Sequence, residues 1–292
     1  MNGLASVSPR LASRTPRLCL VSGGTGGHLM PALALAEELR LQTAHLHGDV
    51  DAAAAADAAY VPAVLVTEGR EVERELLRRG CGQIPCLELP PAGRGRLATG
   101  LWLVRAVAAA RRLLREHGIT AVVSTGGRPS FPVGLAARSL RLPLYLLEQN
   151  AVMGRANRWL RPFAEHVFCG LSPRTTMGRR AVVTGTPLRR GFGNVERDAA
   201  RRALGLPATA RVVLVTGGSQ GARALNDLVP KALAAAGLEL QVLHLSGLGA
   251  DDAVRRRYAA VGGPLVVQVR PVAADMDRLF AAADLVVCRG GG

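Results

Sequence analysis

The chain has 292 residues, of which 49% are hydrophobic and 20% charged, a composition that supports a globular protein of about two domains. Its formal net charge of +15 suits anionic partners, but aromatic residues make up only 3% and no nucleic-acid motif accompanies the charge, so no nucleic-acid partner is expected. No run approaches the roughly 18 apolar residues of a membrane span, so any membrane contact is expected to be peripheral.

Residues 1–16 are rich in Ser, Arg and Pro and contain no acidic residue, which favours a disordered arm over a secretory signal. The cysteines form no Cys-x-x-Cys pair and show no metal-ligand spacing, so we expect small buried residues in a reducing compartment and no metal site. A Cys81–Cys86 disulfide is the alternative. The five cysteines are Cys19, Cys81, Cys86, Cys169 and Cys288.

Short apolar β-type runs alternate with amphipathic helical segments in the first half of the chain. We expect strands at 17–22, 61–67, 119–124, 142–147, 167–169 and 181–183, and helices at 31–40, 71–79, 101–116, 132–140 and 155–160. Residues 41–60 depart from this pattern, and their alanine-rich stretch 51–59 is either a helix or a loose insertion.

A second cycle of the same kind begins near residue 186. We expect strands at 211–216, 240–245, 265–269 and 285–288, and helices at 201–204, 222–235, 251–260 and 276–282. Strands that alternate with helices predict an α/β fold of two doubly wound parallel-sheet domains, 17–185 and 186–292. The second cycle has fewer units and ends on glycines where a helix normally opens, so we expect an incomplete second domain.

Three strand-to-helix turns are rich in glycine, at residues 22–28, 124–132 and 216–223. Such turns let the backbone approach a ligand, and the helix N-terminus that follows favours a diphosphate. The alternative is a tight turn that only packs a helix on a strand. The third turn lacks both the Gly-Lys-Ser/Thr ending of a P-loop and a dinucleotide fingerprint, which argues against nucleotide hydrolysis and dinucleotide binding.

Polar and basic side chains accompany these turns. Glu148, Gln149 and Asn150 follow a strand and are well placed for sugar hydroxyls, with helix capping by Asn150 as the alternative. Arg189 lies in the segment between the two cycles, where it either reaches a ligand or is a solvated linker residue. His28 ends the first turn, and its neutral imidazole is able to accept a proton at cellular pH, although a lone histidine is more often structural.

In this order, these strings resemble the MurG family of bacterial UDP-N-acetylglucosamine transferases, over residues 17–292. Further matches are residues 66–71, Gly154, Asn157, Trp159, Leu160, Asp275, Met276 and residues 283–288. The resemblance implies a GT-B-like fold of two Rossmann-like domains facing a cleft. It implies an inverting transfer of GlcNAc from UDP-GlcNAc to lipid I, an undecaprenyl-diphospho-MurNAc-pentapeptide, to give lipid II for peptidoglycan.

The resemblance also implies which residues act. Donor contacts would come from Thr25, Gly26, Gly27, Asn150, Arg189, Ser219 and Ala273, with Gly127, Ser130, Glu148, Gln149, Gly218 and Gln220 as secondary candidates. His28 would be the candidate general base, and no cofactor is implied. The site would lie at the cytoplasmic face of the inner membrane, with the protein bound peripherally to anionic lipid.

Candidates for that membrane contact are residues 89–101, with Arg94 and Arg96, and the basic helix that follows, with Arg105, Arg111, Arg112 and Arg115. An ordinary solvated helix face is the alternative.

Some positions depart from the family pattern. Leu147 stands in place of a common His and Thr186 in place of a common Asn. The motif that grips ribose and uracil after residues 290–292 is absent, so weak donor binding is expected. Two other functions stay open: a related glycosyltransferase acting on another lipid or a natural product, and a non-catalytic nucleotide-sugar-binding module.

Overall fold

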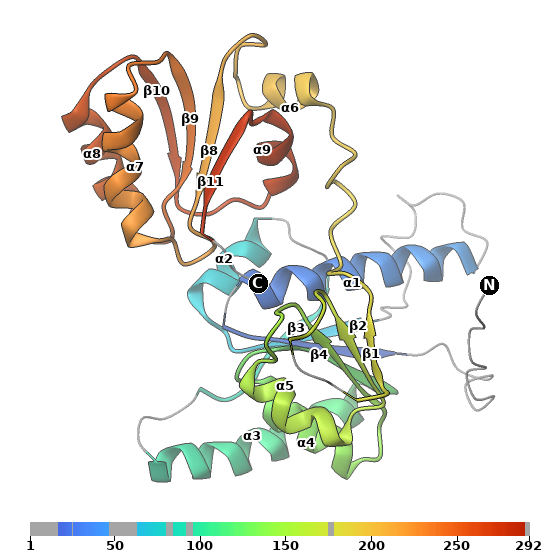
Figure 1. The fold of residues 1–292 in the computed structure, drawn as a ribbon. Coiled ribbons are helices and arrows are strands. Elements are labelled where there is room, and N and C mark those ends of the chain that lie inside the picture. The colour runs from blue at the N-terminus through green and yellow to red at the C-terminus, as the bar shows by residue number, and fades with distance from the viewer. Residues whose placement is uncertain are drawn as a thin grey trace.

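The computed structural model describes residues 17–24, 26–46, 63–79, 84–91, 96–174 and 178–289. These residues form two α/β domains, each built on a parallel sheet, with the second domain above the first in Figure 1. The predicted pair of parallel-sheet domains is therefore confirmed. The expected arm at 1–16 and most of the irregular stretch, 47–60, lie outside the described residues, whereas residues 41–46 continue the first helix.

The sheet of the first domain has seven strands in the order β3-β2-β1-β4-β5-β6-β7. Its strands are β1 (Leu18–Ser22), β2 (Ala63–Thr67), β3 (Cys86–Glu88), β4 (Ala121–Gly126), β5 (Leu144–Glu148), β6 (His166–Cys169) and β7 (Ala181–Val183). Strand order reverses between β1 and β4, so the turns after these two strands lead to helices on opposite faces of the sheet.

Helices cover both faces of this sheet, as Figure 1 shows. They are α1 (Gly26–Leu46), α2 (Glu71–Arg78), α3 (Arg96–Glu116), α4 (Ser130–Ser139) and α5 (Arg155–Leu160), which continues into a 3-10 turn, η3 (Arg161–Phe163). One core cluster lies between the sheet and α3, α4 and α5, and another lies between the sheet and α1 and α2. Strands buried on both faces explain why they read as near-continuous apolar runs.

The second domain repeats the plan with four strands in the order β10-β9-β8-β11. Its elements are α6 (Arg197–Ala203), β8 (Val212–Thr216), α7 (Arg223–Ala235), β9 (Leu240–Leu245), α8 (Asp251–Val261), β10 (Leu265–Arg270), α9 (Met276–Ala282) and β11 (Leu285–Cys288). One core cluster packs α6 and α9 on the sheet, and the other packs α7 and α8 on its opposite face.

Three expectations need correction. Helix α1 begins at Gly26, five residues before the predicted start at Pro31, so this proline lies inside the helix rather than in its first turn. Strand β3 was not predicted, since three edge residues carry no clear period. Cys86 and Cys288 are exposed rather than buried, and Cys86 is a free thiol; Cys81 lies outside the described residues.

The two domains are joined by a segment without helix or strand between β7 and α6 (Figure 1). Arg190 in this segment forms an ion pair with Glu38 of α1, N···O 3.0 Å. Val272, after β10, is 3% exposed and packs into the first-domain cluster beneath α1 and α2. The domains therefore share apolar as well as polar contacts.

A polar network lies inside the second domain between α7, β9 and α8. His244 is 1% exposed. Its Nε2 lies 3.0 Å from Asn226 Oδ1, and its Nδ1 lies 2.9 Å from the Tyr258 hydroxyl. Because Asn226 Nδ2 already donates to Ser246 O, at 2.9 Å, its Oδ1 must accept. His244 therefore carries its proton on Nε2 and accepts at Nδ1 from Tyr258.

This network predicts that the second domain loses stability in mild acid. Burial lowers the pKa of His244 from its ordinary value of 6.5 to about 4. Between these two pH values the unfolded chain therefore binds a proton at His244 that the folded domain does not bind. The contribution of neutral His244 to the free energy of unfolding is fully present above pH 6.5 and falls by roughly 3 kcal/mol as the pH drops to 4. Hydrogen exchange of β9 amides in a pH series measures this slope. His244→Gln is expected to flatten it and His166→Gln to leave it unchanged; equal slopes in all three proteins would contradict the assignment.

Candidate functional site

The turns after β1 and β4 touch through their backbones at the carboxyl edge of the first sheet. Gly127 has φ +90°, and a Cβ there would lie 2.2 Å from Gly23 O. A Cβ on Gly23 would lie 2.3 Å from Pro129 Cδ. Only glycine fits at these two positions, so the predicted first and second glycine turns form one continuous backbone surface.

The turn after β8 meets the turn after β1 across the domain boundary. The N–H of Gly26 donates to Ser219 Oγ at 2.9 Å, and Gln220 Nε2 donates to Gly24 O at 3.0 Å. The Gly26 N–H opens α1 and therefore has no acceptor within the helix. The first and third predicted turns are thus brought together from opposite domains, and an N–H group suited to an anion lies between them.

His28 lies in the first turn of α1, half-buried between the two glycine turns of the first domain. A Cβ on Gly126, whose φ is +104°, would lie 2.7 Å from the imidazole Cδ2, so this glycine makes room for the ring. Thr125 Oγ1 donates to His28 O at 2.9 Å and fixes the backbone. Burial lowers the pKa of His28, and the charge of Glu148 opposes part of that shift. The imidazole is therefore neutral and able to accept a proton near pH 7.

Glu148 organises the loop after β5. Its side chain is 1% exposed. Oε1 accepts from the backbone N and Nδ2 of Asn150, at 3.1 and 2.9 Å. Oε2 accepts from Gly154 N at 2.9 Å and Asn157 Nδ2 at 3.1 Å. The carboxylate positions this loop instead of facing solvent. Gly154 holds the N-cap position of α5, so the alternative capping role of Asn150 is wrong.

The other predicted site residues differ in burial and in what they contact. Ser130 and Gln149 are buried, and Ser130 Oγ donates to Gly126 O at 2.8 Å, which makes it a brace of the second turn. Arg189 is half-buried and donates to Ala274 O. The Ala273 side chain is 8% exposed and packs in the second-domain core, so it does not line the turns.

Three glycines remain among the predicted contacts: Gly27 is half-buried beside His28, Gly127 is half-buried, and Gly218, with φ +80°, is exposed. Thr25 lies outside the described residues.

Two buried side chains at the site escaped prediction. Glu73 of α2 is 0% exposed and accepts the N–H of Gly24 at 2.9 Å. Asn157 of α5 was matched to a family block without a role, and it accepts from Ser124 Oγ at 3.0 Å. The sequence of α2 is dominated by charged residues, so nothing in it marks Glu73 as the carboxylate that turns inward.

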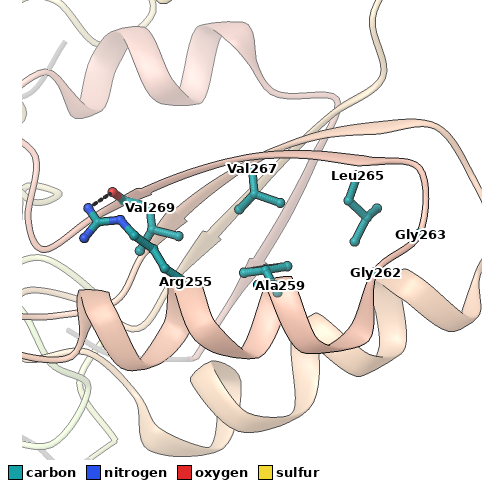
Figure 2. A pocket seen from close by; sticks show the side chains of 8 residues that line it. Arg255, Ala259, Gly262, Gly263, Leu265, Val267 and Val269 are labelled. Atoms are coloured by element: carbon teal, nitrogen blue, oxygen red, sulfur yellow. Dashed lines mark hydrogen bonds between the residues drawn. The ribbon is translucent and has the colours of Figure 1, made fainter.

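A separate cavity of about 370 Å³ lies between α8 and β10 (Figure 2). Arg255 reaches across it and donates to Val269 O at 2.9 Å. None of the predicted site residues lines this cavity. No helix in the described part of the chain is both long and apolar enough to cross a membrane. The described ranges also hold no group of three His, Cys, Asp or Glu side chains arranged for a metal ion.

Replacing Glu148 with glutamine is expected to destabilise the first domain by about 2–3 kcal/mol, because an amide accepts through one oxygen only and its NH₂ would face N–H donors. Both tryptophans, Trp102 and Trp159, lie in this domain, so tryptophan fluorescence during urea unfolding measures the change. Glu116→Gln is the matched control, since this exposed carboxylate only pairs with Arg112, and it should change stability by less than about 0.5 kcal/mol. Equal effects of the two substitutions would contradict the assigned role.

Comparison with protein families matches residues 18–169 to the glycosyltransferase family 28 N-terminal domain. Residues 212–292 match the glycosyltransferase family 28 C-terminal domain. The two matches fall on the two domains of the structure and leave out the segment that joins them.

Two curated relatives are similar along nearly the whole chain. The chain is 38% identical over 286 residues to the UDP-N-acetylglucosamine--N-acetylmuramyl-(pentapeptide) pyrophosphoryl-undecaprenol N-acetylglucosamine transferase of Acidovorax sp. (strain JS42), covering 96% of this chain and 66% of the relative. It is 39% identical over 281 residues to the protein of the same name from Verminephrobacter eiseniae (strain EF01-2), covering 93% and 72%. The chain therefore spans about two thirds of the length of these relatives.

Solved structures give the same architecture. Acinetobacter baumannii MurG superposes with a TM-score of 0.61 at 29% identity, covering 94% of this chain and 74% of that one. A UDP-GlcNAc 2-epimerase from Neisseria meningitidis bound to UDP-GlcNAc gives 0.57 at 12% identity, covering 94% and 78%, and this likeness concerns the fold alone. The predicted GT-B-like arrangement of two Rossmann-like domains is confirmed.

Proposed function

The chain belongs to glycosyltransferase family 28, and from this premise we propose that it transfers GlcNAc from UDP-GlcNAc to lipid I and so forms lipid II for peptidoglycan. The names of the relatives supply the donor and the acceptor, an N-acetylmuramyl-pentapeptide on pyrophosphoryl-undecaprenol. The observation that carries the proposal is the hydrogen bond from Gly26 N to Ser219 Oγ, which joins the first and third glycine turns. Both residues match positions that contact the sugar-nucleotide donor in the family pattern.

The proposed reaction is an inverting displacement. The acceptor hydroxyl oxygen attacks the anomeric carbon of GlcNAc as the bond to the β-phosphate oxygen breaks, and UDP leaves with that electron pair. Negative charge grows on the diphosphate, where the N–H groups at the start of α1 and the Arg189 guanidinium stabilise it. Ser219 would exchange its bond to Gly26 for one to the donor. No covalent intermediate with the enzyme forms.

His28 is the proposed general base that takes the hydroxyl proton. Its lowered pKa keeps the imidazole neutral at pH 7, and Gly126, which lacks a Cβ, makes room for its ring. Glu148, through its charge, favours the imidazolium that forms when the proton arrives.

The transfer itself is tested with radiolabelled UDP-GlcNAc and a short-chain lipid I analogue, with diacylglycerol as the competing acceptor. Product from the lipid I analogue alone is the expected result. Transfer to diacylglycerol instead would favour the related lipid glycosyltransferase. Calorimetric binding of UDP-GlcNAc without transfer to either acceptor would favour a binding module and overturn the proposal.

His28→Ala is expected to lower kcat about 100-fold while the dissociation constant for UDP-GlcNAc stays within a few-fold, because the donor-facing N–H groups remain. The acid limb of the wild-type kcat profile, which reports protonation of the base, should disappear in the variant. His166→Gln, an exposed histidine on β6, is the control and should keep full activity. Near-full turnover by His28→Ala would rule out the base.

We also propose that α3, α4 and α5 carry a surface for anionic membrane at the cytoplasmic face of the inner membrane. These helices form one layer on the first sheet (Figure 1). Leu101 and Val104 of α3 are 62% and 68% exposed, and Trp159 of α5 is 62% exposed. Arg105 and Arg158 are exposed on the same two helices. Apolar side chains flanked by arginine suit an anionic lipid interface.

Within the predicted segment 89–101, the structure corrects one expectation. Leu89 is 6% exposed and belongs to the core cluster under α3, so it contributes nothing to such a surface.

A Leu101→Ser/Val104→Ser double variant should partition about tenfold more weakly to phosphatidylglycerol vesicles, because two exposed apolar side chains are lost from the interface. Co-sedimentation measures this, and added salt should weaken binding of both proteins. Leu228→Ser, at a 64% exposed leucine on α7, is the matched control and should bind as the wild type does. Equal losses from both substitutions would reject this surface.

A further inference from the structure

Glu73 is a carboxylate buried under the first glycine turn. It lies in the third position of α2, with 0% of its surface exposed, between the buried apolar residues Val72 and Leu76 of the same helix. A buried carboxylate costs several kcal/mol unless hydrogen bonds compensate for the lost water. Its placement here therefore depends on the donors that it meets.

Both oxygens of this carboxylate accept backbone N–H groups from different segments. Oε1 accepts from Gly24 at 2.9 Å, and Oε2 accepts from Arg70 at 2.9 Å. Arg70 is the N-cap of α2, so the second bond is an ordinary helix-capping contact. The first bond is 49 residues distant in sequence and joins the helix to the glycine turn. One side chain thus fastens the turn to the start of α2.

The bond to Glu73 orients the N–H of Gly24, whose carbonyl accepts separately from Arg70 Nη1 at 3.4 Å and from the second domain. Gly24 has φ +91°, in the left-handed region, and its carbonyl faces the second domain, where it accepts from Gln220 Nε2 at 3.0 Å. Two residues later, the N–H of Gly26 donates to Ser219 Oγ. The N–H of Gly24 is therefore turned into the first domain, while the C=O of Gly24 and the N–H of Gly26 face the second domain.

We propose that Glu73 is a positioning residue for the glycosyl transfer, holding Gly24 so that the N–H groups of Gly26 and the residues after it converge on the donor diphosphate. This inference rests on the proposed function. Glu73 touches no substrate. By occupying the Gly24 N–H it also directs the anion to the start of α1, where the helix dipole adds to the attraction.

Glu73→Gln tests the proposal, because the amide keeps the size of the side chain but loses one of the two acceptors. KM for UDP-GlcNAc is expected to rise about tenfold with kcat within threefold, since a misaligned turn weakens donor binding in ground and transition state alike. Hydrogen exchange of the peptide carrying Gly24 should accelerate at least tenfold. Glu73→Asp, which keeps both acceptor oxygens, should have a KM between those of Glu73→Gln and the wild type.

Glu75→Gln is the matched control on the same helix, since Glu75 pairs only with Arg78 and Arg79 among the described ion pairs. It should leave KM and exchange unchanged. A purely structural role for Glu73 would lower the folded fraction, and with it kcat, at constant KM, and that result would overturn the inference. Absence of transfer by the wild-type protein would instead reject the proposed function, so the two failures are distinct.

Discussion

A backbone N–H at the start of a helix has no acceptor inside that helix, and this requirement shapes the region where the domains meet. Helix α1 begins at Gly26, whose N–H donates to Ser219 Oγ of the other domain. Helix α2 begins after Arg70, whose N–H donates to Glu73 Oε2. The first bond joins segments that are 193 residues apart in the chain, whereas the second is a capping contact within the first turn of α2. Where the domains meet, a helix N–H is therefore satisfied by a side chain in the free protein, and an anionic ligand is equally able to satisfy it.

Two buried carboxylates provide the rigid base for this arrangement. Glu73 holds the turn after β1 through a backbone N–H, and Glu148 holds the loop after β5 through backbone N–H groups and the side-chain amides of Asn150 and Asn157. Above them, Arg70 and Arg128 both pair with Glu68 at the rim, at 2.9 and 3.0 Å. Negative charge is thus buried beneath the backbone donors, while the two arginines lie at the surface, where the diphosphate of the proposed donor would approach.

The alternation of apolar runs and helical periods was sufficient to predict both parallel sheets, and the glycine strings located the turns at their carboxyl edges. It did not identify the inward-facing Glu73, because α2 is short and highly charged, and its period does not separate a capping carboxylate from a surface one. The start of α1 was misplaced for a related reason. Glycine at Gly26 and Gly27 reads as a turn, yet tertiary contacts from Ser219 and Leu76 enclose a helical first turn there. Ala273 was predicted by position alone, and position does not report that its side chain faces a core.

The junction between the domains is modest in energy. Apart from Val272 and its apolar neighbours, it consists of a few neutral hydrogen bonds and the exposed pair Arg190–Glu38. Contacts of these kinds together amount to a few kcal/mol. A difference of this size would allow a minor open form at roughly 0.1–10%, the range typical of proteins with two conformations. Binding of a sugar nucleotide between the domains would then act by shifting such an equilibrium toward the closed arrangement.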